Sequence, residues 1–115
     1  MLTKRHLAIF PSLRGQRVFI TGGATSVGAA IVAAFAEQGA QVAFVDVAEK
    51  ESAELVASIQ AKGHGTVWWR RCDVRDVAAL QSMIALAQHE LGPFSTLVNN
   101  VASDDRHRLE SVSVD

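Results

Sequence analysis

Short apolar runs alternate along this chain with longer stretches in which apolar residues recur every third or fourth position. The short runs are typical of buried strands, and the longer stretches are typical of helices. Strands are therefore expected over residues 17–20, 41–47, 66–71 and 96–98, and helices over residues 26–38, 49–62 and 76–91. This β-α-β-α-β-α-β order predicts an α/β fold, because strands that alternate with helices form one parallel sheet with helices on both faces.

Each expected helix has an apolar face and is followed by a glycine, the residue that most often ends a helix. In the third expected strand, Trp68 and Trp69 are adjacent, so one ring should pack on each face of the sheet. The expected apolar faces are Val27, Ile31, Ala34 and Phe35 in the first helix, Leu55, Val56 and Ile59 in the second, and Leu80, Ile84, Ala87 and Leu91 in the third.

The composition argues against several classes of function. The chain has 115 residues, with 12 acidic residues against 11 Lys plus Arg, so it lacks the basic excess that nucleic-acid and membrane-surface binders need. One cysteine allows neither an intrachain disulfide nor a thiolate zinc cage, and the four histidines share no metal-ligand spacing, so no metal is expected. No apolar run approaches the roughly 20 residues of a membrane span, and no signal peptide is recognised, so a cytoplasmic location is expected.

A glycine-rich turn over residues 21–28 (TGGATSVG) joins the first expected strand to the first helix. Amide groups and aligned peptide dipoles at a helix N-terminus favour an anion such as a phosphate. Gly22 can adopt a backbone shape that is closed to other residues, and Gly28 lets the helix pack close to the sheet. The hydroxyls of Thr25 and Ser26 could donate hydrogen bonds to a phosphate. Because glycine is common in any tight turn, a purely structural role stays open.

Asp46 is expected at the end of the second strand, 18 positions beyond Gly28. An acidic side chain about that far from such a turn accepts hydrogen bonds from the hydroxyls of an adenosine ribose. The same side chain could instead cap the next helix, and the two roles are compatible. The turn and Asp46 together predict a dinucleotide-binding site in a Rossmann-like, doubly wound sheet.

Residues 13–115 closely resemble the short-chain dehydrogenase/reductase family. Residues 13–22 (LRGQRVFITG) are similar to the family's first strand, and the turn is similar to its Thr-Gly-x-x-x-Gly-x-Gly cofactor motif. Thr21, Gly22 and Gly28 match that motif, whereas Ser26 stands where the middle glycine belongs. The Ser26 hydroxyl is expected to bond a phosphate oxygen if φ is negative; a positive φ would cost about 1 kcal/mol of strain.

Two later segments carry the same resemblance. Residues 72–74 (CDV) resemble the segment that brackets the adenine, with Asp73 towards its amino group. Residues 99–102 (NNVA) resemble the family's Asn-Asn-Ala-Gly, which steadies the central strand and contacts the ribose on the nicotinamide side, with more bulk at the last two positions. The resemblance thus implies a set of cofactor-binding residues: Gly22, Thr25, Ser26, Val27, Gly28, Asp46, Val47, Asp73, Val74 and Asn100.

The resemblance also implies an architecture, a cofactor and a partner. The strand order would be 3-2-1-4, and residues 1–115 would form one partial dinucleotide-binding domain, with an N-terminal extension over residues 1–14 and a polar tail over residues 103–115. Asp46 would bind the free ribose hydroxyls of NAD and repel the extra phosphate of NADP, so NAD is the expected cofactor. The other partner would be a small molecule with a carbonyl/alcohol pair, and neither nucleic acid nor membrane is expected as a partner.

The chain contains no tyrosine, yet the family uses a tyrosine as general acid/base, a lysine to lower its pKa and a serine to orient the substrate. The resemblance therefore implies the N-terminal, NAD-binding portion of an oxidoreductase, which would be inactive by itself. Two alternatives stay open: a nucleotide-binding module without catalysis, and a truncated remnant that does not fold stably. The outer edge of the fourth strand would lack a neighbour, so self-association through it is expected.

Overall fold

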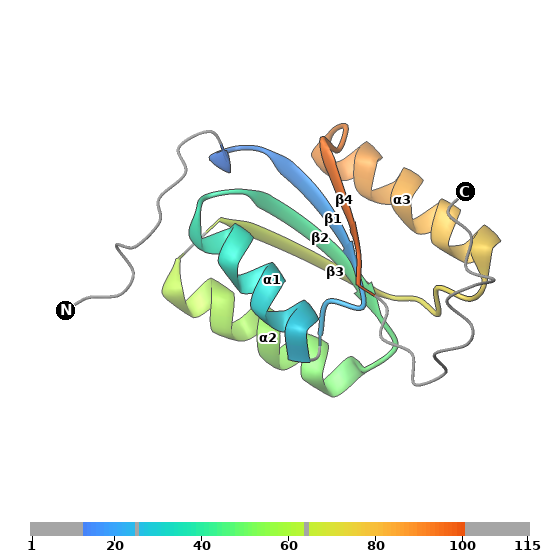
Figure 1. The fold of residues 1–115 in the computed structure, drawn as a ribbon, viewed down its shortest axis with the longest axis horizontal. Coiled ribbons are helices and arrows are strands. Elements are labelled where there is room, and N and C mark those ends of the chain that lie inside the picture. Colours follow the sequence, from blue (N-terminus) through green and yellow to red (C-terminus); the bar gives the residue numbers. More distant parts are fainter. Residues whose placement is uncertain (1–12, 25, 64, 101–115) are drawn as a thin grey trace.

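The computed structural model describes residues 13–24, 26–63 and 65–100 (Figure 1). The strands β1 (Arg17–Thr21), β2 (Gln41–Asp46), β3 (Thr66–Arg71) and β4 (Thr96–Asn99) alternate with the helices α1 (Ser26–Glu37), α2 (Glu49–Lys62) and α3 (Val77–Leu91). All strand pairs are parallel, in the order β3-β2-β1-β4, which confirms the predicted fold and strand order. No element boundary differs from its predicted position by more than one residue. Residues 1–12 of the expected extension and the whole expected tail lie outside the described residues.

Two hydrophobic cores lie on opposite faces of the sheet, beneath α1 and α2 on one side and α3 on the other (Figure 1). Successive strand residues alternate between them: Val42 and Phe44 enter the first core, and Ala43 and Val45 enter the second. All four are fully buried, which explains why β2 reads as a nearly continuous apolar run. The faces predicted for α2 and α3 also pack against these cores.

The adjacent tryptophans of β3 confirm the alternation, because Trp68 packs in the α3 core and Trp69 packs against the core beneath α1 and α2. The Trp68 indole Nε1 donates a hydrogen bond to Glu90 Oε1 at 2.7 Å, and the guanidinium of Arg70 lies 4.5 Å from the Trp68 ring centroid. Arg70 and Arg71, at the end of β3, are both exposed. Together these contacts attach the last turns of α3 to the outer strand.

The buried face of α1 differs from the predicted one. Val27 is 62% exposed and Ala34 is exposed, so these two members of the expected apolar face do not pack on the sheet. Nearly every position of α1 is apolar (SVGAAIVAAFAE), so the spacing of the larger side chains cannot select one side. The side that packs on the sheet is the one that carries Gly28, Val32 and Ala36, with Ile31 and Phe35 partly buried at its margin.

Candidate functional site

The four parallel strands end at one edge of the sheet (Figure 1). The predicted site residues that the structure describes lie at the strand ends or in the segments that follow them. Thr21 at the end of β1 is paired in register with Asn99 of β4, and Asp46 at the end of β2 with Arg71 of β3. The connections from β1 and from β3 run over opposite faces, so the strand order switches direction between β1 and β4. In open α/β sheets, ligands bind at the carboxyl ends of the strands beside such a switch point.

The start of the glycine-rich turn is held against β2 by backbone hydrogen bonds. The amides of Gly22 and Gly23 both donate to the carbonyl of Val45, at 2.9 and 3.4 Å. Gly22 has a φ of +67°, which a residue without a side chain adopts at little cost. Because these two amides already have an acceptor, an anion would have to be bound by amides further on, in the first turn of α1, where no acceptor exists within the helix.

The N-terminus of α1 has no acidic side chain in its first turn, whereas α2 has Glu49 and Glu51. The positive end of the α1 dipole is therefore not compensated by its own sequence, which favours an external anion. Ser26 begins α1 with a φ of +45°. Of the two cases considered for this residue, the structure therefore shows the one with a positive φ, which costs about 1 kcal/mol of backbone strain. Val27 is exposed beside it, and Thr25 lies outside the described residues.

Gly28 is the point of closest approach between α1 and the strand ends. A Cβ atom at this position would overlap the carbonyl oxygen of Gly22 and lie 2.6 Å from Asn100 Nδ2. The close packing predicted for Gly28 is therefore present. Its missing side chain makes room for the amide group of Asn100, which donates to that same carbonyl at 3.2 Å.

A second group of hydrogen bonds joins the ends of β1 and β4. The Thr21 hydroxyl donates to Asn99 Oδ1 at 2.8 Å and accepts from the Asn100 amide at 3.0 Å. The steadying role that the resemblance implied for this segment is thus seen at Asn99 and Asn100, while Val101 and Ala102 lie outside the described residues. Sequence reasoning gave Thr21 no such role, because nothing in the local pattern pairs it with a residue so far along the chain.

Asp46 lies between the glycine-rich turn and α2. Its Oδ2 accepts a hydrogen bond from the Ala24 amide at 3.0 Å, and its Oδ1 accepts one from the Ala48 amide at 2.9 Å. Asp46 was expected as a possible N-cap residue of the next helix, and this expectation is wrong. The N-cap residue of α2 is Ala48, which makes no side-chain capping hydrogen bond. Val47 follows Asp46 and is 48% exposed, so the end of β2 presents a carboxylate beside an accessible apolar side chain.

The segment after β3 contributes one accessible carboxylate. Asp73 is bound by Arg75, whose Nη2 lies 2.8 Å from Oδ2 and whose amide donates to Oδ1 at 3.0 Å. These hydrogen bonds lower the pKa of Asp73 to about 2. Val74 packs against the α3 core. Cys72 is buried, and burial raises the pKa of its thiol.

Replacing Arg75 by Ala should raise the pKa of Asp73 from about 2 towards its ordinary value of 3.8. It should not reach that value, because the backbone amide at position 75 still donates. Since the folded-state pKa lies below the ordinary one, the stabilisation by this carboxylate is complete above pH 3.8 and is lost as the pH falls through about 2. Titration of the carboxyl carbon by NMR measures the shift. Arg71→Ala is the control and should have a smaller effect, because Arg71 is the weakest of the causes; equal effects would contradict the assignment.

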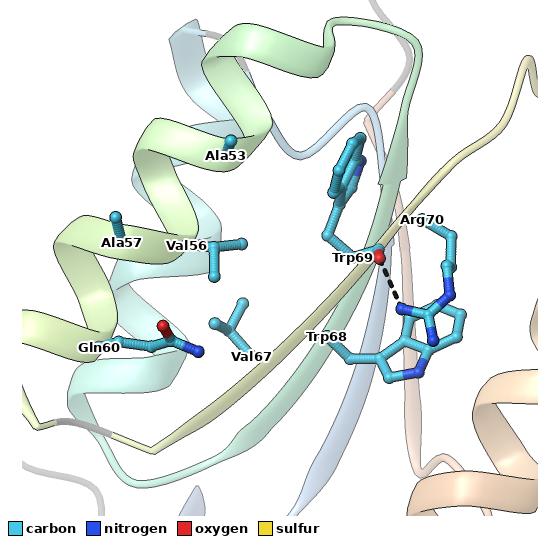
Figure 2. Close-up of a pocket in the computed structure, with 8 residues that line it drawn as sticks. All are labelled: Ala53, Val56, Ala57, Gln60, Val67, Trp68, Trp69 and Arg70. Carbon is cyan, nitrogen blue, oxygen red and sulfur yellow. Dashed lines mark hydrogen bonds between the residues drawn. The ribbon is translucent and has the colours of Figure 1, made fainter.

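The described residues contain no group of three or more His, Cys, Asp or Glu that could hold a metal ion. Nor does any helix within residues 13–24, 26–63 and 65–100 have the length and apolar character needed to cross a membrane. An open groove of about 430 Å³ lies away from the strand ends, between α2 and the outer strand β3 (Figure 2). It is lined by Val56, Gln60, Val67 and Trp69, among others, and by none of the predicted site residues.

Comparison with known proteins gives consistent matches. The family model described as short chain dehydrogenase matches residues 16–115. The chain is 42% identical over 106 residues to D-xylose 1-dehydrogenase of Caulobacter vibrioides, covering 92% of this chain and 41% of that protein. It is 43% identical over 104 residues to the probable galactose dehydrogenase GalD of Rhizobium meliloti, covering 90% and 41%. A crystal structure of a short chain dehydrogenase from Mycobacterium smegmatis matches with a TM-score of 0.78 at 26% identity, over 84% of this chain and 41% of that chain. The chain therefore spans about two-fifths of the length of these relatives.

Proposed function

The chain belongs to the short-chain dehydrogenase family, and from this premise we propose that residues 1–115 form the NAD-binding portion of an oxidoreductase, as one partial dinucleotide-binding domain. The family binds a nicotinamide dinucleotide together with a small-molecule substrate. The observation that carries the proposal is the meeting, at one sheet edge, of the uncompensated α1 N-terminus and the Asp46 carboxylate. The α1 N-terminus suits a diphosphate, and the Asp46 carboxylate suits the ribose hydroxyls of adenosine.

The proposed roles follow the order of the strand ends. The first turn of α1 would receive the diphosphate, Asp46 the adenosine ribose, and Asn100 the ribose on the nicotinamide side. The adenine would lie beside the exposed side chain of Val47, with Asp73 towards its amino group. The full set of proposed contacts is Gly22, Thr25, Ser26, Val27, Gly28, Asp46, Val47, Asp73, Val74 and Asn100.

The bound dinucleotide would supply the hydride acceptor for oxidation of an alcohol to a carbonyl. The residues described here would bind and orient that cofactor, and they offer no tyrosine for the proton transfer, because the chain has none. We place the chemical step in a longer chain that adds the family's tyrosine and lysine. Two relatives are named for sugars, D-xylose and galactose, and we propose a sugar or related polyol as the substrate of the whole protein. We propose the cytoplasm as its location, which is the expectation from the sequence.

The wild-type chain should bind NAD at least roughly tenfold more tightly than NADP. A hydrogen bond to a charged group is worth about 1.5–3 kcal/mol, and about 1.4 kcal/mol corresponds to a factor of ten in affinity. The 2′-phosphate of NADP loses this contact and meets a negative charge. Isothermal titration calorimetry measures both dissociation constants, and Asp46→Ala should shrink their ratio. The control Glu51→Ala removes an exposed carboxylate of α2 and should preserve the ratio; equal or reversed affinities in the wild type would refute the assignment.

A nucleotide-binding module without catalysis is the second candidate, and the absence of tyrosine favours it. Both candidates require the same binding site, so binding alone does not separate them. A longer chain that contains residues 1–115 followed by a Tyr-x-x-x-Lys segment, and that oxidises a sugar, would favour the oxidoreductase. A non-functional remnant would show neither nucleotide binding nor cooperative unfolding.

We also propose that the chain self-associates through the outer edge of β4. In the described sheet β4 pairs only with β1, so one row of its backbone groups faces outwards. Leu97 on this strand is 62% exposed. An open edge beside an apolar side chain favours pairing with a second copy.

A further inference from the structure

Asp46 joins two segments at this point of the fold, the glycine-rich turn and the start of α2. Its Oδ2 accepts from the Ala24 amide, in the glycine-rich turn, and its Oδ1 accepts from the Ala48 amide, at the start of α2. Ala24 is only 6% exposed. Each oxygen of the carboxylate therefore has one backbone partner, and the two partners come from opposite ends of a stretch of 25 residues.

The hydrogen bond from the Ala24 amide is the third of three that hold the glycine-rich turn against the end of β2. The end of β2 holds three successive amides of the turn: the Val45 carbonyl accepts from Gly22 and Gly23, and the Asp46 side chain accepts from Ala24. The third of these is the one nearest the first turn of α1, where the diphosphate is proposed to bind. The side chain of Asp46 thus determines the path of the chain just before the proposed phosphate site.

A carboxylate has about four acceptor positions, so the two backbone amides leave about two for other donors. We propose that Asp46 is a positioning residue for the phosphate-binding turn, in addition to any contact with ribose. This inference rests on the proposed function, because it assigns the turn to a diphosphate. The isosteric Asp46→Asn variant cannot hold both amides, because Asn accepts at only one side-chain oxygen and its NH₂ group would face the other amide.

The test compares ADP with 2′,3′-dideoxy-ADP, which has no ribose hydroxyls for Asp46 to contact. Calorimetry should show that Asp46→Asn weakens the binding of the dideoxy nucleotide by about tenfold or more. Removing a negative charge near a diphosphate would by itself strengthen binding, so the expected effect has the opposite sign. Glu51→Gln makes the same charge change at an exposed position of α2 and is the matched control; it should not weaken binding. The proposal is overturned if Asp46→Asn weakens ADP binding but leaves dideoxy-ADP within twofold of the wild type.

Hydrogen exchange by NMR separates this inference from the proposed function. In Asp46→Asn at least one of the amides of Ala24 and Ala48 should exchange faster, because the one side-chain oxygen cannot accept from both. The amide of Gly22, which is bound to a backbone carbonyl, should stay protected. If the wild type binds neither nucleotide, the proposed function fails and this measurement alone decides whether Asp46 holds the turn. If the variant does not fold, the wild type still provides a test. Its Ala24 and Ala48 amides should be protected from exchange, because each is bound by an oxygen of Asp46, and fast exchange of either one overturns the proposal.

Discussion

Gly28→Ala is expected to lower the free energy of unfolding by about 3 kcal/mol and to abolish measurable nucleotide binding. The added methyl group would overlap the Gly22 carbonyl oxygen and crowd Asn100 Nδ2, which lies 2.6 Å from the position of the new Cβ. Both neighbours belong to the hydrogen bonds that join the turn to β4. The helix would have to move away from the strand ends, and its first turn would move with it. Thermal or urea unfolding, together with calorimetric titration of NAD, measures the two losses.

Gly63→Ala is the control for Gly28→Ala. A Cβ at Gly63 meets nothing within 4 Å, but φ there is +72°, so that variant should lose only the roughly 1 kcal/mol that a left-handed residue costs. The difference between the two variants then reports the steric overlap at Gly28. An unfolding free energy of Gly28→Ala equal to that of the control would show that α1 can shift without penalty, and would contradict the close-approach argument.

Leu97→Lys is expected to weaken self-association of the chain by at least roughly tenfold. A lysine on an open edge strand opposes pairing with a second sheet, because its charge would be buried in the new contact. Size-exclusion chromatography with light scattering over a dilution series should show a wild-type mass that rises with concentration and a variant that stays monomeric.

Val77→Lys tests whether the sheet edge itself is responsible for the association. Val77 is 61% exposed, almost the same as Leu97, but it begins α3 rather than lying on an edge strand. This control should associate like the wild type. Equal loss of association in both variants would mean that general surface hydrophobicity drives it, and a wild type that is monomeric at every concentration would end the proposal.

The elements and their order could be predicted because each segment carries a local signal that no neighbour contradicts. Residues 42–45 are fully buried on both faces, so their apolar character was sufficient to identify an inner parallel strand. The apolar stripe of α3 was also informative, since polar residues at 81–82 and 88–90 interrupt the apolar sequence on its other sides. In α1 the same reasoning failed, because alanine and valine surround the helix and only the close contact at Gly28 selects its buried side.

The sequence was sufficient to predict which residues belong to the candidate site, but not which hydrogen bonds join them. Asp46 was identified from the number of residues that separate it from the glycine-rich turn. Its hydrogen bonds to Ala24 and Ala48, however, depend on how its side chain is oriented relative to two loops. The pairing of Thr21 with Asn99 depends on the register between β1 and β4. Such contacts arise only when the sheet is assembled, so a pattern read along one chain has no means of indicating them.

The bonds between Thr21 and Asn100 also bear on the order of events during synthesis. These residues are 79 positions apart, and at roughly 5–20 residues per second a ribosome needs about 4–16 s to pass from one to the other. Until then β1 can pair with β2 but not with β4, so a nascent chain carries an incomplete sheet in which β1 is still an edge strand. A chaperone that shields β1 would have to act within those seconds, before the asparagine pair emerges and β4 covers that edge.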